Sequence, residues 1–363
     1  MIISRTPFRI SFFGGGTDYP AWYREHGGSV LATTIDKYCY LTCRYLPPFF
    51  EHRLRILYSR IELCRSVDEI VHPAVREVLR YLGIDRGVEI HHDGDLPARS
   101  GMGSSSAFTV GLLHALHALN GRMTSKRQLA LEGIHVEQER LRETVGSQDQ
   151  VLAAYGGFNH IIFATSGEIT VRPMTLAPDR VRELESHLML IFTGINRTAS
   201  DIAGSYATNT SENARIIRGI GQMVDEGMAI LAGRDDIARF GRLLHESWQA
   251  KRALGQRVSN SWIEDIYDAA LGAGAIGGKL MGAGGGGFLV LFARPDDQPK
   301  VRDRLRGFLH VPFRFESSGS QIIFFDEEAD YSREDGERHV RRFEGFRELT
   351  DIESASPVER HEP

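Results

Sequence analysis

The stretch Pro97–Ala107 reads PARSGMGSSSA and places glycines and serines directly ahead of a helical pattern. Apolar residues recur at helical spacing from Phe108 to Leu119, and Asn120-Gly121 then supplies a stop signal. The free N–H groups and the dipole of a helix N-terminus attract anions, and glycines let a phosphate approach the backbone. An ordinary serine-capped helix is the alternative, but it does not explain two glycines in Gly-x-Gly spacing. The segment therefore predicts a phosphate-binding loop whose serine hydroxyls can also ligate a metal ion.

Two other segments are equally rich in glycine. Arg5–Phe13 has a strand pattern and runs into the loop Gly14–Asp18, GGGTD, while Gly272–Gly287 leads into a strand at Phe288–Ala293. The letters of Gly272–Gly287 match the dinucleotide-binding fingerprint twice, but that fingerprint follows a strand and opens a helix, the reverse of the order here. Neither the Walker pattern nor the protein-kinase motifs occur. We therefore expect a phosphate loop of another class.

The remaining sequence predicts further helices and strands. Lys126–Glu143 has an amphipathic helical pattern, and Ser147 is placed to cap a short helix running from Asp149 to Tyr155. Strand-like runs follow at Phe158–Phe163 and Leu188–Thr193, and helical patterns dominate from Asn209 to Leu271.

The boundary between two lobes is expected in the aperiodic stretch between Pro173 and Pro178. A chain of 363 residues is long for a single core, so two packed lobes with a site between them are favoured. We therefore predict an α+β protein with lobes at residues 1–178 and 179–330 and a charged tail at 331–363.

Composition excludes several classes of protein. The chain is 42% hydrophobic and 25% charged, as in ordinary globular proteins, and its net charge is −5. From Glu327 onward the sequence has twelve acidic and six basic side chains, so most of the negative charge lies in this tail. The rest of the chain is close to neutral and lacks the basic surface that binds nucleic acid or an anionic membrane. The N-terminus does not resemble a signal peptide, and no run of about 20 apolar residues occurs. Three clustered cysteines suggest neither a disulfide framework nor a zinc site, so a reducing cytoplasm is expected.

Taken in order and spacing, the three glycine segments resemble the signature motifs of the GHMP kinases, the class of galactokinase, homoserine kinase, mevalonate kinase and phosphomevalonate kinase. The motifs are Thr6–Tyr19, Pro97–Ala107 and Lys279–Phe288, and the resemblance covers roughly the first 330 residues. It implies a ribosomal-protein-like N-terminal lobe, a ferredoxin-like C-terminal lobe, and phosphorylation of a small-molecule hydroxyl with ATP and Mg²⁺ as cofactors.

Within this class the chain looks most similar to the D-glycero-D-manno-heptose 7-phosphate kinases, which phosphorylate the anomeric hydroxyl on the route to nucleotide-activated heptose. The segments that carry this likeness are Gly14–Asp18, Gly146–Gln150 with Gly156–Asn159, and Phe192–Gly194 followed by Arg197. Galactokinases have Glu-His where this chain has Gly15-Gly16. Removal of that carboxylate and its bulk would make room for a phosphorylated sugar, because a carboxylate repels a phosphate.

The resemblance also implies roles for individual residues. Asp149 is expected to accept the proton of the acceptor hydroxyl, and Arg9 to stabilise both that carboxylate and the transferring phosphoryl group. An aspartate that merely stabilises its own helix and an exposed strand arginine are the plainer alternatives. The phosphates of ATP are expected along Gly101, Met102, Gly103, Ser104, Ser105, Ser106, Gly282 and Gly284.

Metal and sugar ligands follow from the same motifs. Ser105 is expected to ligate Mg²⁺ together with Glu139, with Glu137 as the second choice, although these glutamates could equally form a solvated helix face. The sugar is expected to contact Gly15, Gly16, Thr17, Asp18 and Arg197, where Asp18 could instead stabilise its turn and Arg197 could be a surface arginine.

One position departs from the class pattern, because Arg99 stands where the second motif usually has glycine. Arg99 either limits how the loop curls or contacts a phosphate directly. The sugar pocket is the least determined part, so fucokinase-like and galactokinase-like enzymes and a sugar sensor without catalysis remain alternatives. The simultaneous presence of Arg9, Ser105, Glu139 and Asp149 argues against the sensor. A small-molecule sugar phosphate is the expected partner, a homodimer is left open, and no partner of nucleic acid or membrane is expected.

Overall fold

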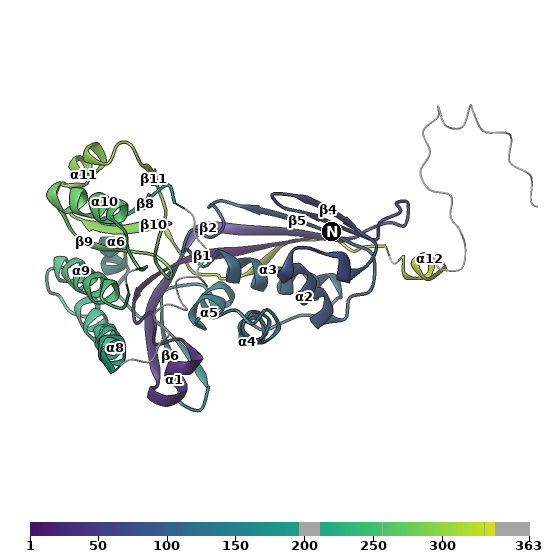
Figure 1. Ribbon diagram of the computed structural model, residues 1–363, viewed down its shortest axis with the longest axis horizontal. Helices are drawn as coiled ribbons and strands as arrows, with labels where there is room; N and C mark the ends of the chain where they lie inside the picture. Colours follow the sequence, from purple (N-terminus) through teal and green to yellow (C-terminus); the bar gives the residue numbers. More distant parts are fainter. Residues whose placement is uncertain (196–210, 256, 330, 338–363) are drawn as a thin grey trace, which may run out of the picture.

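The computed structural model describes residues 1–195, 211–255, 257–329 and 331–337. These residues form two lobes, each built on its own sheet, and the molecule is elongated (Figure 1). The α+β, two-lobe fold predicted from the sequence is confirmed.

The first lobe is built on a sheet with the main strand order β13-β1-β2-β5-β3-β4, to which β6, β7 and β12 add at the end nearer the second lobe. Its strands are β1 Ile2–Phe13, β2 Gly28–Tyr45, β3 Leu54–Leu57, β4 Ile61–Cys64, β5 Val88–Gly94, β6 Asn159–Phe163, β7 Ile169–Pro173, β12 Phe315–Glu316 and β13 Gln321–Phe325. The antiparallel pair of β1 and β2 forms its spine, since both strands run almost the full length of the lobe (Figure 1).

Helices cover one face of this sheet (Figure 1). They are α2 Pro73–Leu82, α3 Ser104–Leu119, α4 Lys126–His135 and α5 Gln148–Tyr155, while α1 Pro20–His26 follows the first glycine loop and a short 3₁₀ turn spans Val67–Glu69. Nearly every residue of α3 is buried, because the helix lies against β1 and β2 and is flanked by α2, α4 and α5. The position of the α3 N-terminus is therefore fixed by packing on several sides.

The helix predicted over Lys126–Glu143 is shorter than expected. Its regular part, α4, ends at His135 and continues as one π-helical turn over Val136–Arg140. Ser147 does precede α5, but its side chain does not cap that helix; its hydroxyl accepts a hydrogen bond from Gln138 Nε2 at 3.1 Å instead.

The second lobe has the βαββαβ order and the strand order β11-β8-β10-β9 of a ferredoxin-like sheet. Its elements are α6 Pro178–His187, β8 Leu188–Phe192, α8 Ser211–Ala232, α9 Ala238–Arg252, α10 Ser261–Gly272, β9 Ala275–Leu280, β10 Phe288–Ala293, α11 Gln298–Arg304 and β11 Leu309–Val311. The strand expected at Phe288–Ala293 is confirmed. Strand β9 was not expected, because three of its six residues are glycine or lysine.

The chain does not stay in the second lobe until residue 330. After β11 it returns to the first sheet, where β12 pairs with β2 and β13 pairs with the edge of β1. The boundary proposed at residue 330 therefore differs from the structure, since Phe315–Phe325 belongs to the sheet of the first lobe. Helix α12, Ser332–Glu337, follows this return.

Phenylalanines join the two lobes into one core. The ring of Phe240 on α9 lies 5.3 Å from that of Phe12 and 5.0 Å from that of Phe13, both at the end of β1. Phe240 also lies 6.4 Å from Phe292 of β10, so a continuous aromatic cluster connects the two sheets. Such buried edge-to-face contacts make the lobe junction part of the fold rather than a loose hinge.

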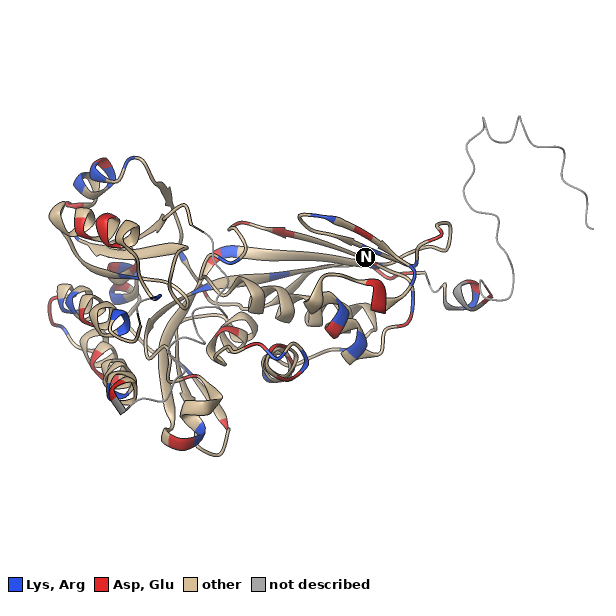
Figure 2. Cartoon of the chain, in the orientation of Figure 1, with Lys and Arg blue, Asp and Glu red and all other residues tan. Residues whose placement is uncertain are grey.

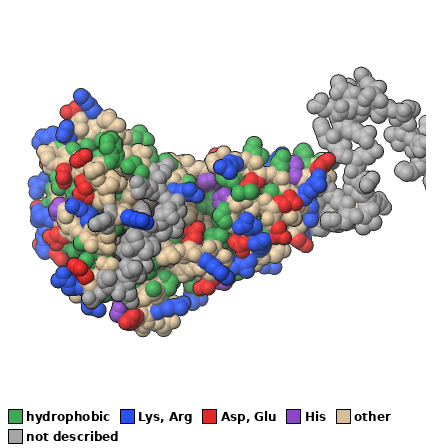
Figure 3. All heavy atoms as spheres, viewed as in Figure 1, with side chains coloured by type: hydrophobic (Ala, Val, Ile, Leu, Met, Phe, Trp, Pro, Cys, Tyr) green, Lys and Arg blue, Asp and Glu red, His purple; other side chains and the backbone are tan. Residues whose placement is uncertain are grey.

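Charges of both signs are interspersed over the two lobes (Figure 2). On the face shown in Figure 3 blue and red side chains alternate, and no large patch of a single sign appears. None of the described helices combines the length and the hydropathy needed to span a bilayer.

Candidate active site

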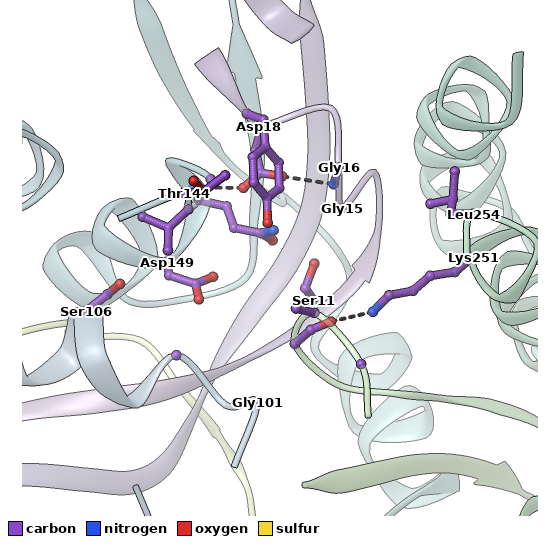
Figure 4. A pocket seen from close by; sticks show the side chains of 18 of the residues that line it. Ser11, Gly15, Gly16, Asp18, Gly101, Ser106, Thr144, Asp149, Lys251 and Leu254 are labelled. Atoms are coloured by element: carbon purple, nitrogen blue, oxygen red, sulfur yellow. Dashed lines mark hydrogen bonds between the residues drawn. The ribbon is translucent and has the colours of Figure 1, made fainter. Parts of the chain in front are cut away.

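A cavity of about 370 Å³ lies between the lobes, where the three glycine segments meet. Figure 4 shows Asp18 and Asp149 on one side of this space and, on the other, Lys251 of α9 and Leu254 just after that helix. Most of the predicted site residues line it, namely Arg9, Gly15, Gly16, Asp18, Gly101, Gly103, Ser104, Ser105, Ser106, Asp149, Gly282 and Gly284.

Other predicted residues are not brought to this cavity. The side chain of Met102 is fully buried in the core, and its carbonyl accepts a hydrogen bond from the Arg9 backbone N–H at 3.0 Å. Thr17 was expected to contact the sugar, but it is buried, and its hydroxyl donates to the Gly14 carbonyl at 2.7 Å and also bonds Ser29. It therefore holds the first glycine loop closed. Arg197 lies outside the described residues.

Arg9 and Asp149 form a two-point ion pair at the centre of the site. Arg9 Nε donates to Asp149 Oδ1 and Arg9 Nη2 to Asp149 Oδ2, both at 2.7 Å, while Nη1 donates to the Gly101 carbonyl at 2.6 Å. The arginine side chain is 6% exposed and that of Asp149 is 24% exposed, so the carboxylate faces the cavity. This planar pairing fixes the carboxylate beside the phosphate loop. Asp149 lies in the first turn of α5, as predicted.

The predicted phosphate loop does open α3. Gly101 and Gly103 have φ angles of +80° and +77°, in the left-handed region where glycine is favoured, and Gly103 is the residue before the first turn of the helix. Arg99 also adopts a left-handed conformation, with φ +60°, which explains why glycine suits this position. Its backbone N–H donates to Ser104 Oγ at 3.0 Å, and its side chain reaches the cavity wall.

The third glycine segment braces this loop from behind. A Cβ atom on Gly287 would lie 2.1 Å from the Ser100 carbonyl oxygen, and one on Gly282 would lie 2.6 Å from Gly101 Cα. Phe288 N–H also donates to the Ser100 carbonyl at 3.2 Å. No side chain fits between the two loops, so glycine is required at this contact.

Asp18 ties the first glycine loop to the segment before α5. Its Oδ1 accepts from Gly16 N–H at 2.9 Å and its Oδ2 from Gln148 N–H at 3.3 Å. Gly146 is packed so closely that an added Cβ would lie 1.9 Å from Asp18 Oδ2. Burial, together with the nearby Asp149 carboxylate, raises the pKa of Asp18 above its ordinary value. The carboxylate lines the cavity, so it combines the structural role with access to a ligand.

The carboxylate nearest the serines is that of Glu137, not Glu139. Neither glutamate lines the cavity itself. Glu139 is exposed on the π-helical turn, whereas Glu137 is 1% exposed and accepts a hydrogen bond at 2.9 Å from Oγ of Ser106, which does line the cavity. The reason is helical spacing: Gly133 packs against α3 and α5, and Glu137, four residues later, lies on the same face. Ser105 lines the cavity, but Ser106 makes the carboxylate contact.

The surroundings of Glu137 fit a divalent cation. Its Oε1 is buried without a hydrogen-bond partner, and burial raises the pKa of this carboxyl to about 8. A buried oxygen without a donor is a ready ligand for a hard cation. Among the described residues no group of three or more His, Cys, Asp or Glu side chains could form a complete metal site, so phosphate oxygens would have to supply the remaining ligands.

Two lysines of the second lobe were missed by the sequence analysis. Lys251 of α9 and Lys279 of β9 both line the cavity. Lys279 stands inside the third motif but was given no role. Lys251 could have been found from its spacing, because it follows Leu244 and Trp248 on the buried side of α9, where a lysine is unusual.

A helix N-terminus with an aspartate–arginine pair directly beside it, in a cavity between two lobes, fits a phosphotransferase with an alcohol group as acceptor. Comparison with protein families agrees with this class. The model described as GHMP kinases N terminal domain matches residues 69–157, and that described as GHMP kinases C terminal matches residues 228–311. The chain belongs to the GHMP kinases.

Individual relatives are similar at modest identity. The D-glycero-alpha-D-manno-heptose 7-phosphate kinase of Campylobacter jejuni is 27% identical over 84% of this chain and 93% of its own length. The bifunctional fucokinase/GDP-fucose pyrophosphorylase of Arabidopsis thaliana is 26% identical over 82% of this chain, which spans 30% of that longer protein. The structure of a D-glycero-D-manno-heptose 1-phosphate kinase from Bacteroides thetaiotaomicron superposes with a TM-score of 0.74 at 24% identity, covering 90% of this chain and all of that one, and supports the fold.

Proposed function

We propose that this protein transfers the γ-phosphoryl group of ATP to the anomeric hydroxyl of D-glycero-D-manno-heptose 7-phosphate, giving the 1,7-bisphosphate and ADP. The observation that carries the proposal is the pair of 2.7 Å contacts that hold Asp149 against Arg9 beside the phosphate loop. This geometry gives the acceptor hydroxyl a carboxylate and the phosphoryl group a neighbouring guanidinium.

The proposed reaction uses few protein groups. The hydroxyl oxygen forms a bond to the γ-phosphorus, the bond from that phosphorus to the β,γ-bridging oxygen breaks, and the hydroxyl proton passes to the Asp149 carboxylate. Positioning and neutralisation of charge account for most of the catalysis of such transfers. The N–H groups at the start of α3 suit the phosphates, and Arg9 suits the charge of the group in transit.

Mg²⁺ is proposed as the cofactor, held by the Ser106 hydroxyl and the Glu137 carboxylate. When bound it would neutralise the phosphate oxygens of ATP. Ser105, which was the metal ligand expected from the sequence, immediately precedes Ser106 on α3. It lines the cavity and is therefore available to bind the phosphates.

The acceptor is assigned from the shape of the first glycine loop. Gly15 and Gly16 line the cavity and carry no side chain, and a Cβ added at Gly16 would meet no atom within 4 Å. This space beside Asp18 suits an acceptor longer than a hexose. The heptose 7-phosphate kinase relative supports the same class of acceptor.

The acceptor is tested by measuring ADP release with ATP and Mg²⁺ on heptose 7-phosphate, unphosphorylated heptose, mannose, fucose and galactose. We expect the highest kcat/KM on heptose 7-phosphate and at least about a tenfold preference over unphosphorylated heptose, because one charge-assisted phosphate contact is worth about 1.5–3 kcal/mol. Preferred turnover of galactose, or of fucose, the sugar in the name of the Arabidopsis relative, would support the sugar-kinase reaction but show that heptose 7-phosphate is not the acceptor. ATP binding without turnover of any sugar would instead favour the sensor.

A further inference from the structure

Lys251 brings a positive charge from the second lobe to the point where the other catalytic groups converge. Its side chain extends from α9 across the cavity, and its Nζ donates a hydrogen bond to the Gly282 carbonyl, with the Leu280 carbonyl 3.5 Å away (Figure 4). Gly282 is the residue that packs on Gly101 of the phosphate loop. The amine of Lys251 is therefore connected to the phosphate loop through a single residue, Gly282.

Neither cavity lysine has an anionic partner in the described part of the chain. Lys251 bonds only backbone carbonyls, and Lys279 donates to the Phe12 carbonyl at 2.7 Å. No carboxylate among the described residues lies within ion-pair distance of either nitrogen, while the carboxylate of Asp149 is already paired with Arg9. Both ammonium groups lie in the wall of the cavity and have only backbone carbonyls as partners. This arrangement indicates that an anion binds in the cavity.

The charged groups around Lys251 come from four elements. They are Arg9 of β1, Asp18 of the first glycine loop, Asp149 of α5 and Lys279 of β9. Burial, followed by the charge of Arg9, lowers the pKa of Lys251 to about 8, and burial lowers that of Lys279 as well. A bound phosphoryl group would reverse this effect by giving the ammonium form a counter-ion.

The position of Lys251 indicates that its anionic ligand is the phosphoryl group being transferred and not a phosphate carried by the sugar. Arg9 Nη1 bonds the Gly101 carbonyl, and Lys251 bonds Gly282, which packs on Gly101, so both cations are anchored to the same point of the phosphate loop. Asp149, the proposed proton acceptor, is held by the same Arg9. A distant phosphate on the far end of the acceptor would lie away from this pair.

We propose that Lys251 is a further catalytic residue, which binds the phosphoryl group as it moves from ATP to the acceptor and so supplies a second cation opposite Arg9. This inference rests on the proposed kinase reaction. The bonds made and broken are those already given, and Lys251 keeps its proton throughout. Because Lys251 belongs to α9, the second lobe contributes a group to the transfer itself.

The test compares Lys251→Met with Lys126→Met as a matched control. Lys126 also donates only to backbone carbonyls, those of Tyr155 at 2.8 Å and Ser318 at 2.9 Å, but it does not line the cavity. For Lys251→Met we expect kcat to fall about 100-fold, as when one donor to a developing oxyanion is removed. The affinity for the non-hydrolysable analogue AMP-PNP should fall about tenfold and that for ADP less than about twofold, because only the former has a γ-phosphoryl group. Lys126→Met should leave all three unchanged.

Nucleotide binding needs no acceptor, so the inference can fail independently of the proposed substrate. Equal losses of ADP and AMP-PNP affinity with a lower melting temperature would overturn it and make Lys251 a brace of the third loop. A normal kcat with a raised KM confined to phosphorylated sugars would also overturn it, since Lys251 would then bind the phosphate of the acceptor. We expect the melting temperature of Lys251→Met at pH 7 to equal or exceed that of the unchanged protein, because a buried ammonium without an anion is removed.

Discussion

At the scale of single residues, the proposed function depends on how the Asp149 carboxylate is held. Asp149 was singled out because the resemblance to the GHMP kinases implies a proton acceptor at this position, and the structure pairs it with Arg9 through two 2.7 Å hydrogen bonds. Their contact was expected only from the resemblance to the GHMP kinases, because no local pattern connects two residues that are 140 positions apart.

Replacement of Asp149 by Asn should lower kcat by about 10²–10⁴-fold, because the amide cannot accept the hydroxyl proton in the transition state. The dissociation constant for ADP should stay within about threefold, as the phosphate loop is kept. Asp179→Asn is the matched control: Asp179 also lies in the first turn of a helix, α6, but far from the cavity. Comparable activity of the two variants would assign Asp149 the plain helix-stabilising role.

The choice between Glu137 and Glu139 shows where sequence reasoning fails at this scale. Both lie on the segment that leads toward α5, and nothing in their letters separates them. Packing separates them, since Gly133 and Glu137 share a buried face while Glu139 turns to solvent. Thr17 is a second example. It was expected to contact the sugar, but its hydroxyl bonds backbone groups of its own loop and of Ser29.

Glu137→Gln should therefore reduce kcat by at least about 100-fold and raise the Mg²⁺ concentration required for half-maximal activity. The reason is that loss of a ligating carboxylate weakens the binding of a hard cation. Glu139→Gln, only two positions away, should behave as the unchanged protein. Titration of activity with Mg²⁺ at saturating ATP measures both. Equal effects of the two substitutions would refute the assignment of Glu137.

The pH dependence follows from Lys251. Its pKa of about 8 lies below the ordinary value of 10.5, so the folded protein loses this proton at lower pH than the unfolded chain does. Activity that needs the ammonium should fall as pH rises through about 8. Stability from this group should instead rise between about pH 8 and 10.5, because the unfolded chain then holds more protons.

Both trends should vanish in Lys251→Met, so the measurement is the difference between the two proteins in kcat/KM for ATP and in denaturation midpoint from pH 6.5 to 10. An identical fall in activity above pH 8 in both proteins would assign the titration to another group.

At the scale of elements, three glycine loops are arranged around the start of α3. The second loop is the one that we propose binds the phosphates, the first carries Asp18, and the third lies behind the second. The sequence indicated each loop, because glycine runs between regular elements are conspicuous. Gly282 and Gly284 of the third loop were expected along the phosphates, and the close approach of Gly287 to Ser100 supports a bracing role for this loop as well.

Gly287→Ala should test this contact. Its φ of +105° disfavours alanine, and the added Cβ would lie 2.1 Å from the Ser100 carbonyl oxygen. We expect a loss of at least about 2 kcal/mol in free energy of unfolding, given the cost of left-handed strain and overpacking. ADP affinity should also fall, since the phosphate loop must move.

Gly272→Ala is the control, because Gly272 ends α10 in the same glycine-rich segment and a Cβ there would meet no atom within 4 Å. Urea denaturation and ADP titration compare the two. If Gly287→Ala kept full stability and ADP affinity, the bracing role would be wrong.

At the scale of the whole molecule, one hydrophobic cluster connects the two sheets, and the candidate active-site cavity lies between the lobes. The predicted α+β architecture with two lobes is confirmed, because helical and strand periodicities extend over many residues. The return of Phe315–Phe325 to the first sheet could not be predicted, since short strands added at an edge carry little local signal. Lys251 was missed for a related reason: its function depends on a cavity that exists only once the lobes meet.

The phenylalanine cluster at the lobe junction gives this arrangement a mechanical consequence. Phe240, which contacts Phe12 and Phe13, lies on the same helix as Lys251. The packing that joins the lobes therefore also sets where the second lobe presents its cation. The proposed active site therefore exists only when the lobes are joined, because Asp149 and Arg9 come from one lobe and Lys251 from the other.

The most direct test of the central claim is phosphorus NMR of the product formed from heptose 7-phosphate, ATP and Mg²⁺. We predict a second phosphate resonance, split by coupling to the anomeric proton, that grows in step with ADP and is absent with Asp149→Asn. A new phosphate on any other hydroxyl, or no new phosphate while fucose or galactose is phosphorylated by the same preparation, would contradict the assignment of heptose 7-phosphate as the acceptor.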